Sequence, residues 1–403
     1  MRQPSSSSSG PRPVTAPIDV VAYTLTSSLG AGVQSMRESL RANRGGLTNT
    51  AWPNCEVPCH LGQMALPNTS DLDAARLSRN NASIAWALQQ DDFTPAVSAA
   101  LNRHGAARVG LVMGTSTSSI DRTEAAYANL GEDDRFASDH QQPFTHNPHA
   151  PGDFVAEKLG LLGPRVTISA ACASSAKVFA TAQRWLNQNL VDACVVGGAD
   201  SLCLSVIYGF HSLQLVAEDA CKPFDADRAG ISLGEAAGFA LLERAAAGEN
   251  HELQLFGVGE SCDAYHMSSA HPDGVGARLS MQRALAAADI GLKDIDYINL
   301  HGTGTRANDA TEGKVCSDLM SAKTLASATK SWTGHTLGAA GIVEAVLCLD
   351  ALQTGFVPGT RNTQTVEDNF PLLLESIEAS PATALSNSFG FGGNNCTLVF
   401  GKS

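Results

Sequence analysis

The sequence predicts an α/β protein built from two similar halves, on the strength of three observations. Short runs of β-branched and other apolar residues alternate along the chain with stretches in which apolar residues recur at helical spacing. The chain contains 37 glycines, and they cluster after the apolar runs, where turns at strand ends are expected. The second half repeats the first in outline, which indicates a duplicated domain with its functional site between the halves.

The composition is that of an ordinary soluble globular protein. The 403 residues are 43% hydrophobic and 17% charged, which is enough for one large or two normal domains. The net charge of −13 argues against nucleic acid and anionic membranes as partners. We find no run of 18 apolar residues, so no transmembrane span is expected. Residues 1–14 are rich in serine and proline and lack an apolar core, so we expect a disordered tail rather than a signal peptide, and a cytoplasmic protein.

The ten cysteines lack the dense spacing of a secreted disulfide scaffold, so we expect reduced thiols. One short stretch, Cys55-Glu-Val-Pro-Cys59-His60, could supply metal ligands. It has no second ligand pair at usable spacing. A solvent-facing loop is therefore favoured over a zinc site, and no metal is expected.

In the first half, β-branched and apolar runs predict strands, and helical spacing of apolar residues predicts helices. The predicted strands span residues 18–25, 109–113, 193–196 and 239–242. The predicted helices span residues 30–42 and 70–90, and another begins near residue 176. Residues 119–152 are polar and contain histidines and prolines, so we expect a long excursion there. Residues 244–251 are expected to link the halves.

The second half repeats this order of elements. An apolar strand over 297–300 runs into a Gly-Thr-x-Thr turn at 302–305, as the strand over 109–113 runs into the same pattern at 114–117. A strand over 326–330 and a helix of small residues over 338–345 repeat the strand and helix around Cys172. We therefore expect matching strand ends of the two halves to meet at one site.

Cys172 is the candidate nucleophile. A short β-branched run over 166–168 is followed by small residues from Ser169 to Ser175, and helical spacing begins at Ala176. A thiol at the start of a helix lies near free amide groups and the positive end of the dipole, which favour thiolate over thiol. The alternative is an inert buried cysteine, which would be the default for a cysteine alone in an apolar stretch.

Other residues favour the catalytic interpretation. His301 lies on a glycine-rich turn after a strand, and Lys330 and His335 lie on a second such turn. One histidine alone would more often be structural, but two histidines and a lysine on such turns form a more specific pattern. Phe391 lies between glycines in a hairpin-like turn over 387–394. It is interpreted either as a core phenylalanine in a β-turn or as a gate whose backbone amide faces the nucleophile.

With these motifs the sequence resembles the elongating β-ketoacyl-acyl-carrier-protein synthases, which belong to the thiolase-like condensing enzymes. The matching stretches are A-C-A-S-S-A, V-V-G-G-A-D, P-F-D-A-D-R-A-G, C-D-A-Y-H-M, H-G-T-G-T-R-A-N-D, T-K-S-W-T-G-H-T-L-G-A-A-G and N-S-F-G-F-G-G-N-N. The resemblance implies a five-layer αβαβα fold with two pseudo-symmetric halves. They would span residues 15–246, with the nucleophile, and 247–403, with the histidines and the lysine.

The resemblance implies a decarboxylative Claisen condensation. Cys172 would receive an acyl chain as a thioester, with the amides of Cys172 and Phe391 as the oxyanion hole. His301 and His335 would donate hydrogen bonds to the thioester oxygen of a malonyl group on acyl carrier protein. They would stabilise the enolate formed as carbon dioxide leaves. Lys330 would maintain the charge balance and orient the histidines. No cofactor is implied beyond the phosphopantetheine that bears the substrates.

The resemblance also assigns supporting positions. These are Glu344, Asp309 and Glu312 in the polar network around the histidines, Thr303, Thr305 and Ser268 along the pantetheine arm, and Thr117 in the acyl pocket. The acidic pair and the threonine pair could instead serve only to cap and stabilise turns. The family commonly has a bulkier apolar residue at the position of Thr117, which suggests a pocket suited to longer, unsaturated or polyketide chains.

The implied partners are an acyl carrier protein and a second subunit. Candidate docking residues for the acidic carrier protein are Arg37, Arg41, Arg76 and Arg79, although each could equally lie on a solvated helix face. Members of the family dimerise through an edge strand, which here would be the strand over 193–196. The sequence leaves open whether the second subunit is identical or is a homologue without the cysteine. Stretches around C-D-A-Y-H-M-S-S resemble synthases of aryl polyene pathways.

Two other functions fit the sequence less well. A non-catalytic partner subunit that sets chain length is disfavoured because Cys172, His301, His335 and Lys330 are all present. A cysteine hydrolase is disfavoured because no acidic residue is found that would orient a histidine beside the cysteine for water activation.

Overall fold

The computed structural model describes residues 17–67, 72–140, 144–145, 147–245 and 251–403. The predicted tail over 1–14 and most of the predicted linker, residues 246–250, lie outside the described residues. The boundary predicted between residues 246 and 247 falls in that gap, so it stays a prediction.

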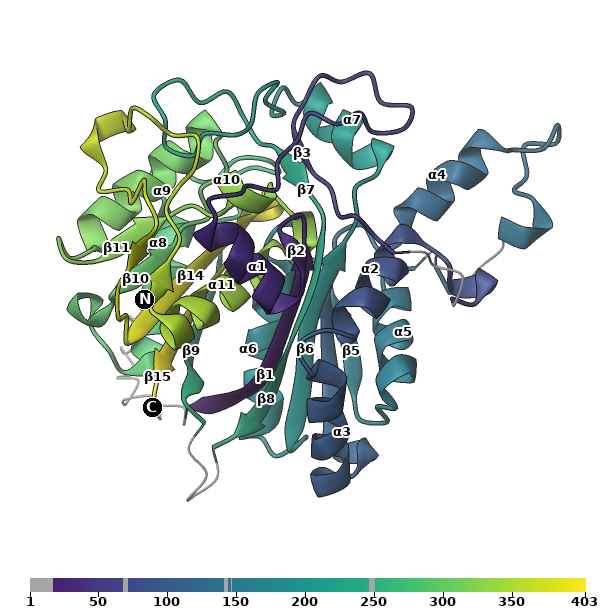
Figure 1. Cartoon of the computed structure of the whole chain (residues 1–403), viewed down its shortest axis with the longest axis horizontal. Helices are drawn as coiled ribbons and strands as arrows, with labels where there is room; N and C mark the ends of the chain where they lie inside the picture. The colour runs from purple at the N-terminus through teal and green to yellow at the C-terminus, as the bar shows by residue number, and fades with distance from the viewer. Residues whose placement is uncertain (1–16, 68–71, 141–143, 146, 246–250) are drawn as a thin grey trace, which may run out of the picture.

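Two five-stranded units join into one large sheet, to which the short β2 (Gly30–Ala31) is added (Figure 1). The first unit has the order β1 (Ile18–Ser27), β8 (Ala236–Arg244), β6 (Ala193–Asp200), β4 (Val109–Gly114) and β5 (Arg165–Ile168). The second has the order β9 (Leu253–Cys262), β15 (Asn394–Lys402), β14 (Thr383–Gly390), β10 (Tyr297–Asn299) and β11 (Leu325–Ser327). The units meet where β1 pairs with β9.

The two units have the same strand directions, which confirms the duplicated α/β fold. In the first unit β4 is parallel to β5 and β6, and β8 is antiparallel to β6 and β1. In the second unit β10 is parallel to β11 and β14, and β15 is antiparallel to β14 and β9. Each strand therefore has a counterpart, as the repeated Gly-Thr-x-Thr turns after β4 and β10 predicted.

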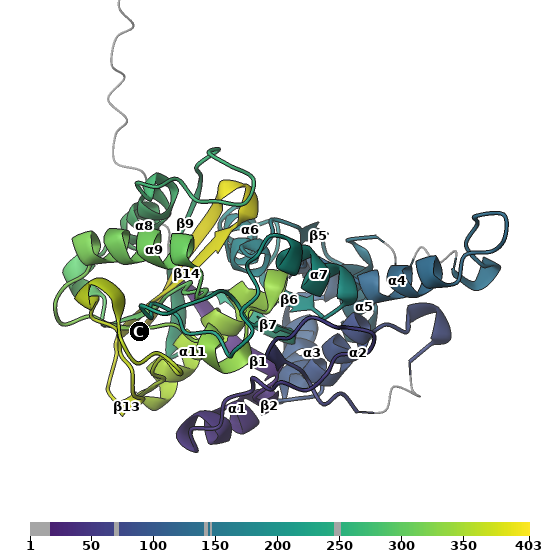
Figure 2. The ribbon, with the colours of Figure 1, turned by 90° about the horizontal axis from the view of Figure 1, so that it is seen from above.

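Helices complete the five layers, as Figures 1 and 2 show. The central layer holds α6 (Ser174–Asn187) and α11 (Ala340–Thr354), which contact each other and both five-stranded units. The outer helices of the first half are α2 (Arg79–Leu88), α3 (Phe93–His104) and α5 (Ala150–Leu159), and those of the second half are α8 (Val275–Ala288) and α9 (Arg306–Leu319). A hydrophobic core fills each space between layers.

Other elements surround this frame. They are α1 (Gly32–Arg41), α4 (Ile120–Ala128), α7 (Leu204–Ser212), α10 (Lys330–Thr333) and the paired short strands β3 (Leu61–Gly62) with β7 (Leu233–Gly234) and β12 (Phe356–Val357) with β13 (Ile377–Glu378). Helix α4 lies in the predicted excursion over 119–152 and projects from the body in Figure 2.

The helix predicted over 70–90 is shorter in the structure. A separate 3₁₀ turn covers Ala74–Arg76, and α2 begins at Arg79. The reason is local capping, because the Ser78 side chain accepts a hydrogen bond from the Asn81 amide at 3.0 Å and ends the irregular segment there.

The prediction that the strand over 193–196 lies at the sheet edge is wrong. That strand is part of β6, which pairs with β4 on one side and β8 on the other, and every residue of it is buried. The outermost strands in the described part of the sheet are β5 and β11. A run that is apolar throughout is typical of a strand covered on both faces, which places it inside a sheet rather than at its edge.

One stretch of the described residues passes a length-and-composition criterion for a membrane span, although it is not an unbroken run of apolar residues. The window Leu337–Thr354, which contains α11, is 18 residues long and apolar enough by length and composition. The window is 89% buried inside the protein. A helix that is apolar on all sides belongs in the core of a large protein when its surroundings are protein, and α11 has both five-stranded units around it.

The two central helices approach closely because glycine and alanine face each other. A Cβ atom at Gly341 of α11 would lie 2.4 Å from the backbone nitrogen of Ala176 in α6. Similarly, a Cβ at Gly114 or Gly198 would lie within 2.6 Å of Ser175 atoms. The start of α6 is therefore fixed by contacts that no larger residue permits.

We expect Gly341→Ala to lower the free energy of unfolding by about 1–3 kcal/mol, the usual cost of overpacking a tight core. The added methyl group would clash with backbone, which cannot move aside as a flexible side chain can. Denaturant unfolding followed by circular dichroism measures the change. The matched control is Gly209→Ala in α7, where nothing lies within 4 Å of the added carbon. There the better helix propensity of alanine should raise stability by about 0.5–1 kcal/mol, and equal losses in both variants would contradict the packing argument.

Candidate active site

Cys172 lies in a strained turn between β5 and α6. The preceding residue, Ala171, has a φ of 48°, in the left-handed region that non-glycine residues seldom adopt. Gly390, at the end of β14, packs against this turn, and a Cβ there would lie 2.9 Å from the Ala170 oxygen and 3.2 Å from the Cys172 nitrogen. The second half of the chain thus fixes the position of the nucleophile, whose side chain is buried.

The prediction that the helix start favours the thiolate is wrong in its net effect. Burial raises the pKa of the Cys172 thiol to about 11. The charge of Lys330 and the backbone amides of Phe391 and Cys172 lower the pKa, but they do not offset the loss of solvation. The residue is therefore a thiol at neutral pH. The amides of Phe391 and Cys172 are the two predicted to form the oxyanion hole, and that role stays a prediction.

His301 is held in one tautomer by Lys330. The histidine follows β10, and the lysine is the first residue of α10. The lysine Nζ donates to His301 Nδ1 at 3.1 Å and to the His301 carbonyl oxygen at 2.6 Å. Because Nδ1 accepts, the ring proton of neutral His301 lies on Nε2. Burial, followed by the charges of Lys330 and His335, lowers the pKa of His301 well below its usual value, so the ring is neutral.

His335 has the same tautomer for a different reason. The backbone amide of Leu337 donates to His335 Nδ1 at 3.0 Å, so the proton of the neutral ring again lies on Nε2. Burial is the main cause that lowers the pKa of His335 well below its usual value. Two neutral imidazoles thus present N–H donors.

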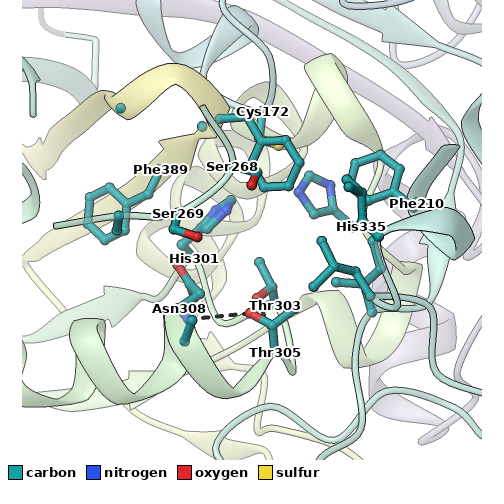
Figure 3. A pocket seen from close by; sticks show the side chains of 18 of the residues that line it. Cys172, Phe210, Ser268, Ser269, His301, Thr303, Thr305, Asn308, His335 and Phe389 are labelled. Carbon is teal, nitrogen blue, oxygen red and sulfur yellow. Dashed lines mark hydrogen bonds between the residues drawn. The ribbon is translucent and has the colours of Figure 1, made fainter. Parts of the chain in front are cut away.

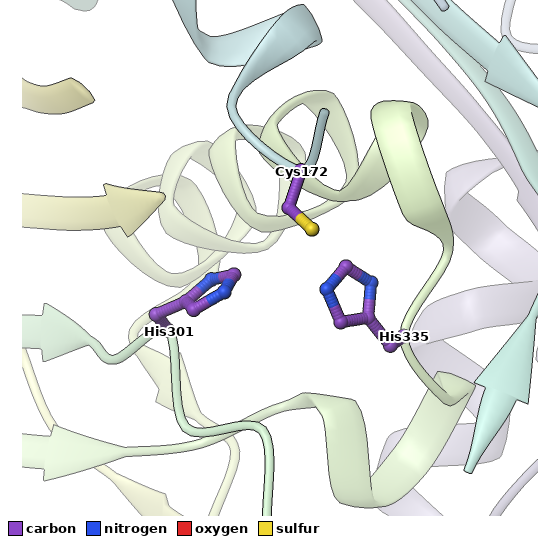
Figure 4. Close-up of side chains that lie close together, drawn as sticks. All are labelled: Cys172, His301 and His335. Carbon is purple, nitrogen blue, oxygen red and sulfur yellow. The ribbon is translucent and has the colours of Figure 1, made fainter. Parts of the chain in front are cut away.

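The three side chains meet in one place (Figure 4). The Cys172 sulfur and ring nitrogens of His301 and His335 all lie within 4.8 Å of one another, and the two rings are perpendicular with centroids 5.5 Å apart. Two converging N–H groups beside a nucleophile can hold a carbonyl oxygen and stabilise negative charge on it.

A metal ion fits this cluster poorly. Ligating histidines usually donate their second ring N–H to an acceptor. Here the Nδ1 atoms of His301 and His335 face the donors Lys330 Nζ and Leu337 N. A metal on Nε2 would force a proton onto Nδ1, against those donors. The donor set therefore suits an oxygen-bearing substrate better than a cation.

A buried polar network supports the histidines. Glu344 of α11 forms a buried ion pair with Lys330. Glu312 accepts the backbone amides of His301 and Gly302, both at 2.8 Å, and Asn387 donates to it at 3.2 Å. Burial raises the pKa of each of these two glutamates to about 7. Glu312 thus fixes the turn that presents His301, and Glu344 acts on that turn through Lys330. A supporting role in catalysis stays a prediction for both.

Asp309 fixes the following glycine-threonine turn. It accepts backbone amides from Thr303 at 3.0 Å, from Gly304 at 3.1 Å and from Phe224 at 2.8 Å. The hydroxyls of Thr303 and Thr305 are 2.9 Å apart, and Thr305 also caps α9 by accepting from the Asn308 amide. Both threonines thus stabilise the turn, which was the alternative to a role in binding pantetheine. Both also line a cavity.

The cavity has a volume of about 240 Å³ and leads from Cys172, His301 and His335 to the surface (Figure 3). Of the predicted positions, Thr303, Thr305, Ser268 and Phe391 line it. Sequence reasoning missed other lining residues: Phe210, Leu213, Leu215, Ile231, Asp263, Phe389 and Asn308. The ring of Phe210 packs on that of Phe391, with centroids 5.7 Å apart. Phe210 was missed because it lies on α7, outside the motifs.

Thr117 is not among the described residues that line this cavity. Its hydroxyl donates to Asp200 at 2.9 Å. The same buried carboxylate accepts from the hydroxyls of Thr115 and Ser116 and from the Gly338 amide at 2.6 Å. Asp200 thus joins the Thr115–Thr117 segment to the turn after His335, and an acyl pocket at Thr117 stays a prediction.

The four arginines proposed for docking all form ion pairs within the chain. The pairs are Arg37 with Asp350, Arg41 with Glu378, Arg76 with Glu157 and Arg79 with the fully buried Glu235. Their charges are therefore partly neutralised, and Arg79 has a structural role. The Cys55 loop lines a separate hollow in which His60 Nδ1 contacts the Glu218 carbonyl oxygen at 2.9 Å. All ten cysteines are free, as predicted.

The chain matches two family models. The beta-ketoacyl synthase N-terminal domain matches residues 15–247, and the beta-ketoacyl synthase C-terminal domain matches residues 254–364. Nodulation protein E of Rhizobium meliloti is 31% identical over 388 residues, which cover 92% of this chain and 96% of that protein. The 3-oxoacyl-acyl-carrier-protein synthase 2 of Vibrio cholerae is 34% identical over 321 residues, covering 74% of this chain and 77% of that protein.

Solved structures of ketosynthases are also similar to this chain. A chain from the complex of a ketosynthase with its chain length factor from Xenorhabdus doucetiae is 37% identical, with a TM-score of 0.88 and coverage of 97% of this chain and 99% of that chain. A chain of the ishigamide ketosynthase/chain length factor is 26% identical, with a TM-score of 0.87 and coverage of 96% and 100%. Domain models that span most of the sequence, relatives above 30% identity and the shared fold lead to one conclusion. The chain belongs to the β-ketoacyl synthase family of condensing enzymes.

Proposed function

We propose that this protein catalyses decarboxylative condensation of an acyl thioester on Cys172 with malonyl-acyl carrier protein, giving a β-ketoacyl-acyl carrier protein. The observation on which this rests is the convergence, within 4.8 Å, of one thiol and one ring nitrogen from each of two neutral histidines in the lining of one cavity. A hydrolase or a scaffold has no need for two neutral imidazoles held in the same tautomer.

In the first half-reaction, the Cys172 sulfur attacks the carbonyl carbon of an acyl thioester. The carbon–sulfur bond to pantetheine breaks, and the thiol proton of Cys172 leaves with the pantetheine sulfur. The backbone amides of Cys172 and Phe391, which lower the pKa of the Cys172 thiol, would hold the oxyanion. One such donor is typically worth about 3–4 kcal/mol of transition-state stabilisation.

In the second half-reaction, the malonyl thioester oxygen would lie between His301 and His335. Loss of carbon dioxide leaves an enolate, whose charge the two N–H groups stabilise. The enolate carbon then attacks the acyl carbonyl carbon, and the Cys172 thiolate leaves and takes up one proton. The ammonium of Lys330 would act through His301, since it holds Nδ1 as an acceptor and is itself neutralised by Glu344.

The partner subunit and pathway are part of the same proposal. The 37% and 26% identical solved structures are complexes of a ketosynthase with a chain length factor, which favours a heterodimer for this chain over a homodimer. Because Cys172 and both histidines are present, this chain would be the catalytic subunit rather than the chain-length-determining one. The similarity to such complexes also favours polyene or polyketide elongation over housekeeping fatty acid synthesis. The free thiols support a cytoplasmic location.

The primary test is acylation of the enzyme. After incubation with acyl carrier proteins bearing chains of graded length, intact-mass spectrometry should detect one acyl adduct on the wild type and none on Cys172→Ala. The preferred chain then identifies the pathway. If no donor gives an adduct, even with a chain length factor added, the proposed function is wrong.

Histidine variants should separate the half-reactions. His301→Ala and His335→Ala should each slow carbon dioxide release from malonyl-acyl carrier protein by roughly a hundredfold or more, because each removes an oxyanion donor. Both should still form the Cys172 adduct, since the histidines are not needed as bases for acylation. Loss of the adduct in either variant, with the fold intact by circular dichroism, would mean that the histidine activates the thiol instead.

The raised pKa of Cys172 predicts a pH-dependent reactivity. Because thiolate is the reactive species and the pKa is about 11, alkylation of Cys172 by iodoacetamide should accelerate about tenfold per pH unit from pH 7 to pH 9. Peptide mass spectrometry resolves Cys172 from the other cysteines, and the exposed Cys262 provides an internal reference. A rate independent of pH over this range would show that the resting residue is already a thiolate.

A further inference from the structure

The outer end of the cavity is formed by three segments. They are the turn after α7, which contributes Leu213 and Leu215, the loop over 263–273, which contributes Ser268 and Ser269, and the start of α9, which contributes Thr305 and Asn308. If the substrate is tethered to a carrier protein, as the proposed function requires, the tether must enter here. Its thioester end reaches Cys172, so its phosphodiester end lies near the cavity mouth.

Among the described residues, Arg306 is the cation placed to meet that phosphate. It lies between the lining residues Thr305 and Ala307, and no other lysine or arginine is adjacent in sequence to any lining residue. Arg306 is exposed, and within the described part of the chain its guanidinium forms no ion pair. This distinguishes it from Arg37, Arg41, Arg76 and Arg79, each of which is paired with a carboxylate of its own chain.

The one carboxylate among the described lining residues has other partners. Asp263 lines the cavity, but its oxygens accept from the His271 amide at 3.0 Å and from Asn395 Nδ2 at 2.5 Å. Arg228 lies beneath the same turn, where its guanidinium is buried and donates to the carbonyl oxygens of Thr305 and Arg306. The backbone at Arg306 is therefore held rigidly while its side chain faces solvent.

Large exposed apolar side chains lie on two of the segments that line the cavity. Tyr208 of α7, Leu213 directly after α7, and Tyr265 and Met267 of the 263–273 loop are 41–78% exposed. Helix α7 and the 263–273 loop both contact the turn that bears Phe391. The ring of Phe210 packs on the ring of Phe391, and the Gly392 amide donates to the Met267 carbonyl oxygen at 2.8 Å. Exposed apolar residues gathered beside a tunnel are typical of a protein-binding surface.

We propose that these five residues, Tyr208, Leu213, Tyr265, Met267 and Arg306, form the docking rim for the acyl carrier protein. Arg306 binds the phosphodiester of the phosphopantetheine arm, and the four apolar side chains pack against the carrier protein itself. The inference rests on the proposed function and replaces the four paired arginines as the docking site. An acidic carrier protein thus docks on an acidic enzyme through apolar contact and the charge of Arg306.

Three malonyl donors test the two parts of the rim separately, with acylated enzyme and initial rates of carbon dioxide release. They are malonyl-acyl carrier protein, malonyl-phosphopantetheine and malonyl-pantetheine, which differ by the protein and then by the phosphate. We expect Arg306→Gln to lower kcat/KM about tenfold for the two donors that bear a phosphate, as loss of one charge-assisted hydrogen bond predicts. Its preference for either of these over malonyl-pantetheine should fall by the same factor.

The double variant Tyr265→Ser/Met267→Gln should reduce kcat/KM for the carrier-protein donor alone, because both side chains are exposed and neither lines the cavity. Arg41→Gln is the matched control, because Arg41 is an exposed arginine paired with Glu378. It should leave all three rates as in the wild type. Equal effects of Arg306→Gln on all three donors, or no effect on any, would overturn the assignment of the phosphate. If the wild-type enzyme releases no carbon dioxide from any donor, the proposed function has failed rather than the docking rim.

Discussion

The close approach of α6 and α11 is the constraint on which the site depends. These helices lie between the two five-stranded units, and glycine in one meets alanine backbone in the other. The nucleophile precedes α6, while His335 and Lys330 precede α11. Any increase in the helix separation would therefore move the thiol away from its donors. The small residues of both helices are therefore required mainly for the short distance between the helices, and less for helix propensity.

Burial is the largest cause of the shifted pKa values at the site. It keeps the thiol protonated, keeps both imidazoles neutral and raises the pKa of Glu312 and Glu344 to about 7. Against this background the ion pair of Lys330 with Glu344 places one ammonium group in the interior without a net charge. That ammonium, in turn, determines which nitrogen of His301 holds the proton. Loss of solvation is thus the largest influence on the pKa values at the site, and individual charges and hydrogen bonds modify its effect.

Much of this was predictable from the sequence, and the failures have physical causes. The alternation of strands and helices and the repeated turns predicted the duplicated fold, because period and turn chemistry are local properties. A run of small residues before a helix identified Cys172, and glycine-rich turns identified His301, Lys330 and His335. The structure brings these four residues together. Sheet order is not local, so the buried strand of β6 was wrongly placed at an edge. The pKa of Cys172 was misjudged because the helix start is visible in the sequence, whereas the depth of burial is not. Phe210 was missed because no motif includes it.

The duplication also has a consequence for how the chemistry is divided. The two central helices begin in contact with each other, yet one is preceded by a nucleophilic thiol and the other by a hydrogen-bond donor. The two similar halves thus contribute complementary groups to one site: the first supplies the thiol and the second supplies the two histidines. An isolated half would lose both its reaction partner and the surface that covers its central helix. The fold can be described as two similar halves, but the reaction requires both of them in one molecule.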